Sequence, residues 1–126
     1  RWNALYPLAS PSFSLYSGDD HTFARAMARG AQGVISVASN ATPATIAKIC
    51  TLIKDRNLEE AKALDHSLLK FYDFLGIEPN PIPIKAIMHI LGYGGGLRLP
   101  LLSLSPQYLA QAREIAELCK TSEQSI

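Results

Sequence analysis

Few residues of this sequence are grouped in a way that could carry out chemistry by themselves. The histidines, His21, His66 and His89, lie far apart in the chain and lack the spacing of metal ligands. The glycine-rich stretch 92–96 is not followed by the Lys-Ser/Thr pair of a phosphate-binding loop. The acidic turn Ser17-Gly18-Asp19-Asp20 remains, and taken alone it fits a plain connection from a strand to a helix. Neither a metal site nor a nucleotide site is predicted.

The composition indicates one globular domain. The 126 residues are 48% hydrophobic and 18% charged, with a formal net charge of +1. No cluster of Lys and Arg with interleaved aromatics is present, which argues against nucleic acid as a partner. No apolar stretch is long enough for a membrane span, and no secretory signal is visible.

Further expectations follow from the two cysteines and from the first residue. Cys50 and Cys119 fall in predicted helices and are expected to be reduced thiols of a cytoplasmic protein. Because the chain starts with Arg1 rather than Met, we expect it to begin inside a longer protein.

The first half of the chain predicts two β/α units after a helix end over 1–8. Strands are expected over 13–17 and 33–37, because both runs are short and rich in apolar or alternating residues. The aspartates after Gly18 are expected to cap a helix from Thr22 to Arg29. A sheet of only two parallel strands leaves open edges, so something else must complete it.

The second half predicts helices only. Thr42 and Pro43 give an N-cap with Pro at the first helical position. A further helix runs from Asn57 to Gly76, and a Pro-punctuated crossing over 78–83 follows. The remaining expectations are a helix over 84–91, an extended segment over 97–102, and a last helix that opens at Ser105-Pro106 and ends near Lys120.

Four motifs in a fixed order resemble the C-terminal portion of the dihydrodipicolinate synthase family. They are Ser17-Gly18-Asp19-Asp20, Gly33-Val34-Ile35-Ser36-Val37, Glu78-Pro79-Asn80-Pro81-Ile82-Pro83-Ile84-Lys85 and Leu97-Arg98-Leu99-Pro100-Leu101. The third motif is the most specific. The resemblance implies an α/β fold: residues 1–56 as the C-terminal part of a (β/α)8 TIM barrel, with its last two strands, and 57–126 as a C-terminal helical domain.

The resemblance also implies a chemistry. Enzymes of this family are lyases of lysine biosynthesis that condense pyruvate with aspartate semialdehyde through a Schiff base on a Lys. By the family pattern that Lys lies upstream of Arg1, so no catalytic residue and no activity of the chain alone are expected. No metal or organic cofactor is implied, because the Lys itself forms the reactive adduct. Five lysines on predicted helices or the crossing are read as solvated or structural: Lys48, Lys54, Lys62, Lys70 and Lys85.

Two residues match the family's pyruvate pocket. The backbone carbonyl of Ile35 is expected to face pyruvate, and Gly18 allows the backbone to approach a ligand. Asn80 and Pro81 are expected to serve the turn of the crossing, and stability, more than the pocket. The expected inward strand faces carry Phe13, Leu15, Val34 and Ser36.

Other interpretations remain open at this point. The chain could instead belong to an N-acetylneuraminate-lyase-like or other 2-keto-acid aldolase of the same superfamily. A different class is a non-catalytic structural half that pairs with a partner chain. For the intact enzyme, the resemblance implies a homo-oligomer whose N-terminal half supplies the remainder of the barrel.

Overall fold

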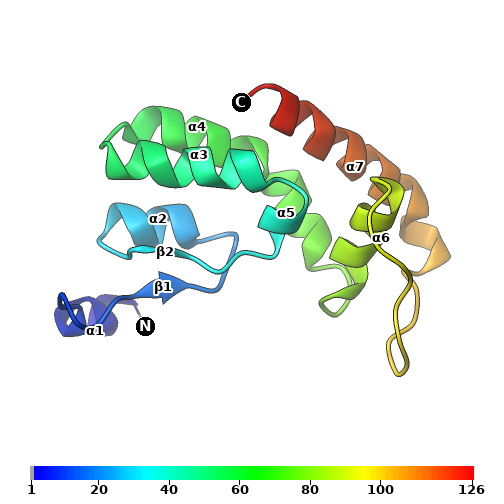
Figure 1. The fold of residues 1–126 in the computed structure, drawn as a ribbon, viewed down its shortest axis with the longest axis horizontal. Coiled ribbons are helices and arrows are strands. Elements are labelled where there is room, and N and C mark those ends of the chain that lie inside the picture. Colours follow the sequence, from blue (N-terminus) through cyan, green and yellow to red (C-terminus); the bar gives the residue numbers. More distant parts are fainter. Residues whose placement is uncertain (1) are drawn as a thin grey trace.

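The computed structural model describes residues 2–126 as an α/β arrangement in which a short parallel sheet lies at one side of a group of helices (Figure 1). In chain order the elements are α1 (Trp2–Leu5), η1 (Tyr6–Leu8), β1 (Tyr16–Ser17), α2 (Phe23–Ala28), β2 (Gly33–Val34), η2 (Ala38–Asn40), α3 (Pro43–Lys54), α4 (Leu58–Ser67), α5 (Leu69–Leu75), α6 (Ile82–Ile90), η3 (Pro106–Tyr108) and α7 (Leu109–Gln124). Helix α2 lies between the strands and the paired helices α3 and α4.

The two strands are parallel, as predicted, but shorter than predicted. Tyr16 pairs with Gly33, and Ser17 pairs with Val34. The pairing continues through hydrogen bonds from the Gln32 amide to the Leu15 carbonyl and from the Ile35 amide to the Ser17 carbonyl, both 2.8 Å. Phe13 instead pairs back with Ser10 in a tight turn, so the first strand does not begin at residue 13.

The sheet has one covered face and one open face. Leu15 and Ser17 are buried, at 6% and 2% exposure, whereas Tyr16 is 57% exposed and Ile35 is 76% exposed. This alternation follows from the period of two in a strand. Leu15 and Val34 were expected on the inward face of the barrel strands. That part of the expectation was wrong, because Leu15 is buried by the chain itself and Val34 packs against the helical core.

The aspartates after β1 do not cap α2. The N-terminus of α2 has no side-chain cap, and the Asp19 carbonyl, not its carboxylate, accepts the Phe23 amide at 3.1 Å. The Asp19 carboxylate accepts the Thr22 hydroxyl, and Asp20 turns toward the segment after β2. The predicted helix itself is present, within the predicted range.

The helical half differs from prediction mainly at helix ends. The single helix expected over 57–76 is interrupted at the fully buried Leu68, which separates α4 from α5. Helix α6 begins at Ile82, inside the expected crossing, because Pro is compatible with a first helical turn. Helix α7 continues past Lys120 to Gln124.

The N-terminus of α3 is capped by a residue from the far end of the chain. Thr42 does not cap it, because its hydroxyl donates to the Ala38 carbonyl at 3.0 Å. The Glu123 carboxylate instead accepts the amides of Ala44 at 3.0 Å and Thr45 at 2.8 Å, and also the Thr45 hydroxyl at 2.7 Å. A carboxylate at this position satisfies free N–H groups and complements the helix dipole. Glu123 thereby fastens the end of α7 to the start of α3.

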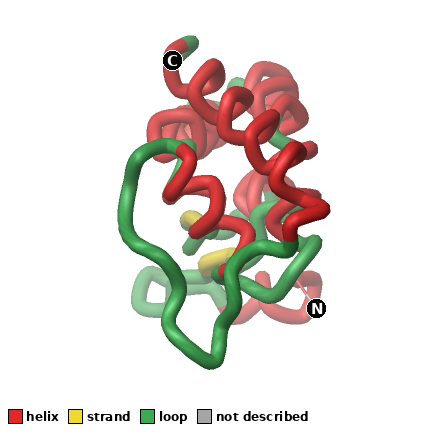
Figure 2. Tube along the Cα trace, turned by 90° about the vertical axis from the view of Figure 1, so that its right-hand side faces the viewer, coloured by secondary structure: helices red, strands yellow, loops and turns green. Residues whose placement is uncertain are grey.

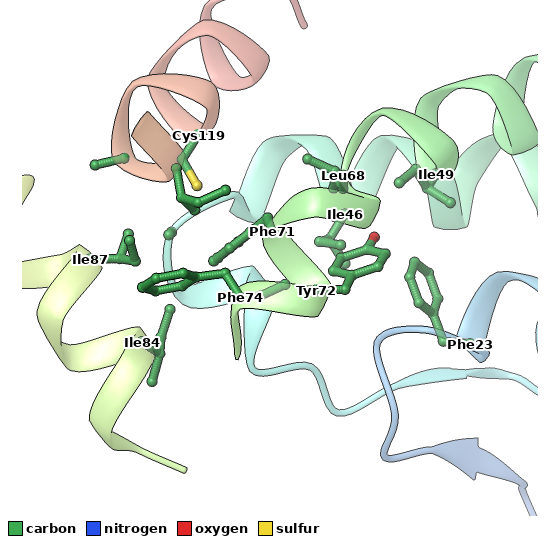
Figure 3. Close-up of a cluster of buried hydrophobic side chains, with 14 of the residues drawn as sticks. Phe23, Ile46, Ile49, Leu68, Phe71, Tyr72, Phe74, Ile84, Ile87 and Cys119 are labelled. Atoms are coloured by element: carbon green, nitrogen blue, oxygen red, sulfur yellow. The ribbon is translucent and has the colours of Figure 1, made fainter. Parts of the chain in front are cut away.

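One buried cluster of apolar side chains joins the first and second halves of the chain (Figure 3). Phe71 and Phe74 of α5 lie in it, with Ile84 and Ile87 of α6 and Cys119 of α7 on one side. On the other side, Tyr72 of α5 extends the cluster toward Phe23 of α2 and toward α3. Helix α5 is therefore the link between the β/α part and the C-terminal helices.

A long loop after α6 departs from the helices (Figures 1 and 2). It carries the segment predicted to be extended and holds Leu99 and Leu102, which are 84% and 69% exposed.

We predict that Glu123→Ala lowers the free energy of unfolding by about 1–2 kcal/mol, because it leaves two helix amides without their acceptor. Urea unfolding of the protein measures this change. The matched control is Glu117→Ala on the same helix, since Glu117 is largely exposed and makes only an ion pair with Lys120 at 2.7 Å. That control should change the free energy by less than about 0.5 kcal/mol. Equal effects of the two substitutions would contradict the capping role.

Candidate functional site

The loops that follow β1 and β2 lie side by side at the carboxyl edge of the sheet. Gly18 is exposed and comes directly after β1, and Ile35 comes directly after β2. The hydrogen bond from Ile35 to the Ser17 carbonyl, 2.8 Å long, holds both residues at this edge. In parallel β/α proteins this edge is where binding and catalytic groups gather. The structure therefore brings the two predicted site residues to neighbouring positions.

Asp20 connects the two loops. One carboxylate oxygen, Oδ2, accepts the backbone amides of Val37 at 3.1 Å and Ala38 at 3.0 Å. Asp20 is only 8% exposed, so these bonds are shielded from water. This role was not predicted from the sequence, because local rules assign both aspartates to the adjacent helix.

Two hollows adjoin this edge. One, of about 470 Å³, is lined on one side by Ile35 and Ser36, and on the other by Asn80, Lys85 and Tyr93. A smaller one, of about 190 Å³, is lined by Gly18, His21 and Tyr72. Gly18 and Ile35 thus border different hollows. Val37 and Asn80 border both, so the two hollows meet at these residues.

Asn80 is a site candidate that the sequence analysis placed in a structural role. Its side chain is exposed and makes no hydrogen bond to any of residues 2–126. Pro81, not Asn80, precedes α6 at the N-cap position, and that helix has no side-chain cap. Asn80 does lie in a turn of the crossing, which the hydrogen bond from the Ile82 amide to the Pro79 carbonyl closes at 2.9 Å, but it does not cap the helix. Its amide is free to face the hollows, a fact that only the three-dimensional position reveals.

Beneath the Gly18 loop lies a polar cluster that does not provide a free base. The Tyr72 hydroxyl, almost completely buried, donates to Asp65 at 3.1 Å. Burial raises the pKa of Tyr72 far above its usual value and also raises the pKa of Asp65, so Tyr72 is a neutral phenol at physiological pH. His21 packs edge-on against the Tyr72 ring and pairs with Asp73 at 2.9 Å. These contacts support the loop from below.

Most of the lysine and cysteine side chains of the described residues lie away from this edge. Each lysine is on a helix, and only Lys85 borders the larger hollow. Burial raises the pKa of Cys50, and raises that of Cys119 to about 12, which keeps both thiols protonated. Residues 2–126 hold no group of three or more potential metal ligands. Nor do they form a helix of the length and apolar character that crossing a membrane requires.

The fold matches part of solved TIM-barrel lyases. The dihydrodipicolinate synthase of Aquifex aeolicus superposes with a TM-score of 0.87 and 34% sequence identity, over 93% of this chain and 40% of that chain. The chloride-inhibited synthase of Acinetobacter baumannii, solved with pyruvate, gives a TM-score of 0.88 and 33% identity over 95% of this chain and 42% of that one.

The sequence comparison agrees with the structural one. The model of the Dihydrodipicolinate synthetase family matches residues 2–118, and the chain belongs to this family. It is 49% identical over 116 residues to the 4-hydroxy-tetrahydrodipicolinate synthase of Xanthomonas axonopodis pv. citri, covering 92% of this chain and 38% of that protein. The Stenotrophomonas maltophilia (strain K279a) enzyme is 45% identical, and 39% of it is covered. Membership of the family, which the four motifs predicted, is confirmed, and the chain spans about two fifths of these relatives.

We predict that Asn80→Ala changes the free energy of unfolding by less than about 0.5 kcal/mol, because the exposed side chain has no partner among the described residues. Thr42→Val is the comparison, since its fully buried hydroxyl bonds the Ala38 carbonyl at 3.0 Å. That substitution should cost about 1–3 kcal/mol in urea unfolding. A loss at Asn80 as large as the loss at Thr42 would restore the structural role that the sequence suggested.

Proposed function

We propose that this chain is the C-terminal part of a 4-hydroxy-tetrahydrodipicolinate synthase, which condenses pyruvate with aspartate semialdehyde in lysine biosynthesis. The observation that carries the proposal is the edge where Gly18 and Ile35 lie side by side, in a chain 49% identical to such a synthase. The synthase names of the relatives favour this function over that of an N-acetylneuraminate-lyase-like aldolase.

In this proposal the strands are the last two of a (β/α)8 barrel. Strand β1 is strand seven and β2 is strand eight, within residues 1–56, and residues 57–126 form the C-terminal helical domain. The open face of the sheet supports this placement, because Tyr16 and Ile35 are large apolar side chains that the chain leaves exposed. The two parts share the buried cluster around α5, so they have one common core rather than two independent cores.

The residues of this chain bind and orient pyruvate, while the Lys that forms the Schiff base comes from the N-terminal half. A Cβ added to Gly18 would meet no atom within 4 Å, so the space beside its backbone is open to a ligand. The Ile35 carbonyl accepts no hydrogen bond from residues 2–126, so it is available to the substrate. Asn80, at the junction of the hollows, adds an amide that can donate to a carboxylate or accept from a hydroxyl.

The proposed assembly needs no metal or organic cofactor, since the Lys amine itself forms the adduct with pyruvate. Its partners are the N-terminal half of the barrel and, as in the family resemblance, further copies of the same enzyme. The free thiols Cys50 and Cys119 are compatible with the reducing cytoplasm, where we place the enzyme.

We predict that borohydride reduction with pyruvate gives no covalent adduct on the chain alone. Together with the N-terminal half, it gives one adduct, on a Lys of that half, since reduction converts a Schiff base into a stable secondary amine. Intact-mass and peptide mass spectrometry locate the adduct. Lys85→Arg is the control, because Lys85 is the lysine that borders the larger hollow, and the substituted complex should still form the adduct. Stoichiometric modification of Lys85, or no adduct in the complete complex, would contradict the proposal.

A further inference from the structure

We infer that Asp20 is a positioning residue for pyruvate, which aligns the Gly18 and Ile35 backbones by tying their loops together. This inference rests on the proposed function and names a residue that holds the site without touching the substrate.

The geometry of the tie is specific to Asp20. Its backbone lies two residues after Gly18, and its Oδ2 accepts the amides of Val37 and Ala38, which follow Ile35 by two and three residues. A single oxygen that receives two amides from one loop fixes both the distance and the angle between the loops. Apart from the hydrogen bonds of the sheet, the two bonds of Asp20 are the hydrogen bonds between the β1 loop and the β2 loop among the described residues.

The alternative, that Asp20 serves stability alone, fits the contacts less well. Asp20 is 8% exposed, and the second oxygen of its carboxylate, Oδ1, is buried without a hydrogen bond from any of residues 2–126. The described residues also form no ion pair with it. Burying a carboxylate in this way is costly. What the chain gains from it is a fixed geometry at the edge where pyruvate would bind, in agreement with the general need to support a binding site from behind.

The neighbouring Asp19 provides a matched comparison. It has the same side chain and an adjacent position, but it is exposed and its carboxylate bonds the Thr22 hydroxyl within its own loop. It makes no bond to the loop after β2. A general effect of removing negative charge near Gly18 would appear at both positions, whereas a positioning effect would appear only at Asp20.

The consequence for catalysis is selective. Pyruvate forms the Schiff base in the first half of the reaction, and the aldehyde reacts in the second, so kcat/KM for each substrate reports its own half. Displacement of a binding group by about 1 Å can cost about 100-fold in rate. Loss of the tie should therefore lower kcat/KM for pyruvate more than kcat/KM for aspartate semialdehyde.

The test uses the complete enzyme with Asp20→Ala, which removes the tie, and Asp20→Glu, which keeps the charge but lengthens the side chain by one methylene. We expect both to lower kcat/KM for pyruvate at least about tenfold and kcat/KM for the aldehyde less than about threefold. Asp20→Asn keeps an oxygen for both amides and should remain within about threefold, as should Asp19→Ala. Melting temperatures establish that each variant is folded at the assay temperature.

The outcomes separate the two levels of the account. Folded Asp20→Ala or Asp20→Glu enzyme with kcat/KM for pyruvate within threefold of the original would overturn the inference. An equal fall of kcat/KM for both substrates, in proportion to the fall in melting temperature, would also overturn the inference. If the Asp20→Ala enzyme does not fold, the kcat/KM values of the Asp20→Glu enzyme decide the test. Failure of the unsubstituted complete enzyme to trap pyruvate with borohydride would instead overturn the proposed function, and the inference with it.

Discussion

The parallel pairing of β1 with β2 is the constraint on which the rest of this structure depends. It brings Gly18 and Ile35, which lie in different β/α units, to one edge. It also fixes which face the helices cover, because side chains alternate along each strand. The side chains of Leu15 and Ser17 are buried by the chain, whereas those of Tyr16 and Ile35 remain exposed. The pairing is short, and two parallel strands bury little of their surface, so the interactions around it have to hold it in place.

Two carboxylates supply much of that support across long stretches of sequence. Asp20 joins the loops that follow the strands, and Glu123 fastens α7 to the N-terminus of α3. Helix α5 fills the core with Phe71, Tyr72 and Phe74. The C-terminal helices are thus linked by packing and hydrogen bonds to the same β/α units that present the site.

The sequence predicted the order and direction of the elements well, because strand runs, Pro at helix starts and apolar spacing are local signals. It failed where the partner is distant. Local rules assign an aspartate to the nearest helix, yet Asp20 bonds residues 17 and 18 positions away. Thr42 satisfied the rule for an N-cap, but Glu123 is the residue that caps α3. Gly18 and Ile35 came from the family resemblance, since neither side chain carries a chemical signal of its own.

The central claim is that this sheet is completed by strands outside the chain, and hydrogen exchange tests it most directly. The amides of Gln32 and Ile35 are the informative ones, because both donate across the strand pair. We expect these amides to exchange rapidly in the chain alone and to become strongly protected when the N-terminal half of the barrel is present. Strong protection of both amides in a monodisperse monomer of the chain alone would contradict the account, because the two strands would then be stable without neighbours.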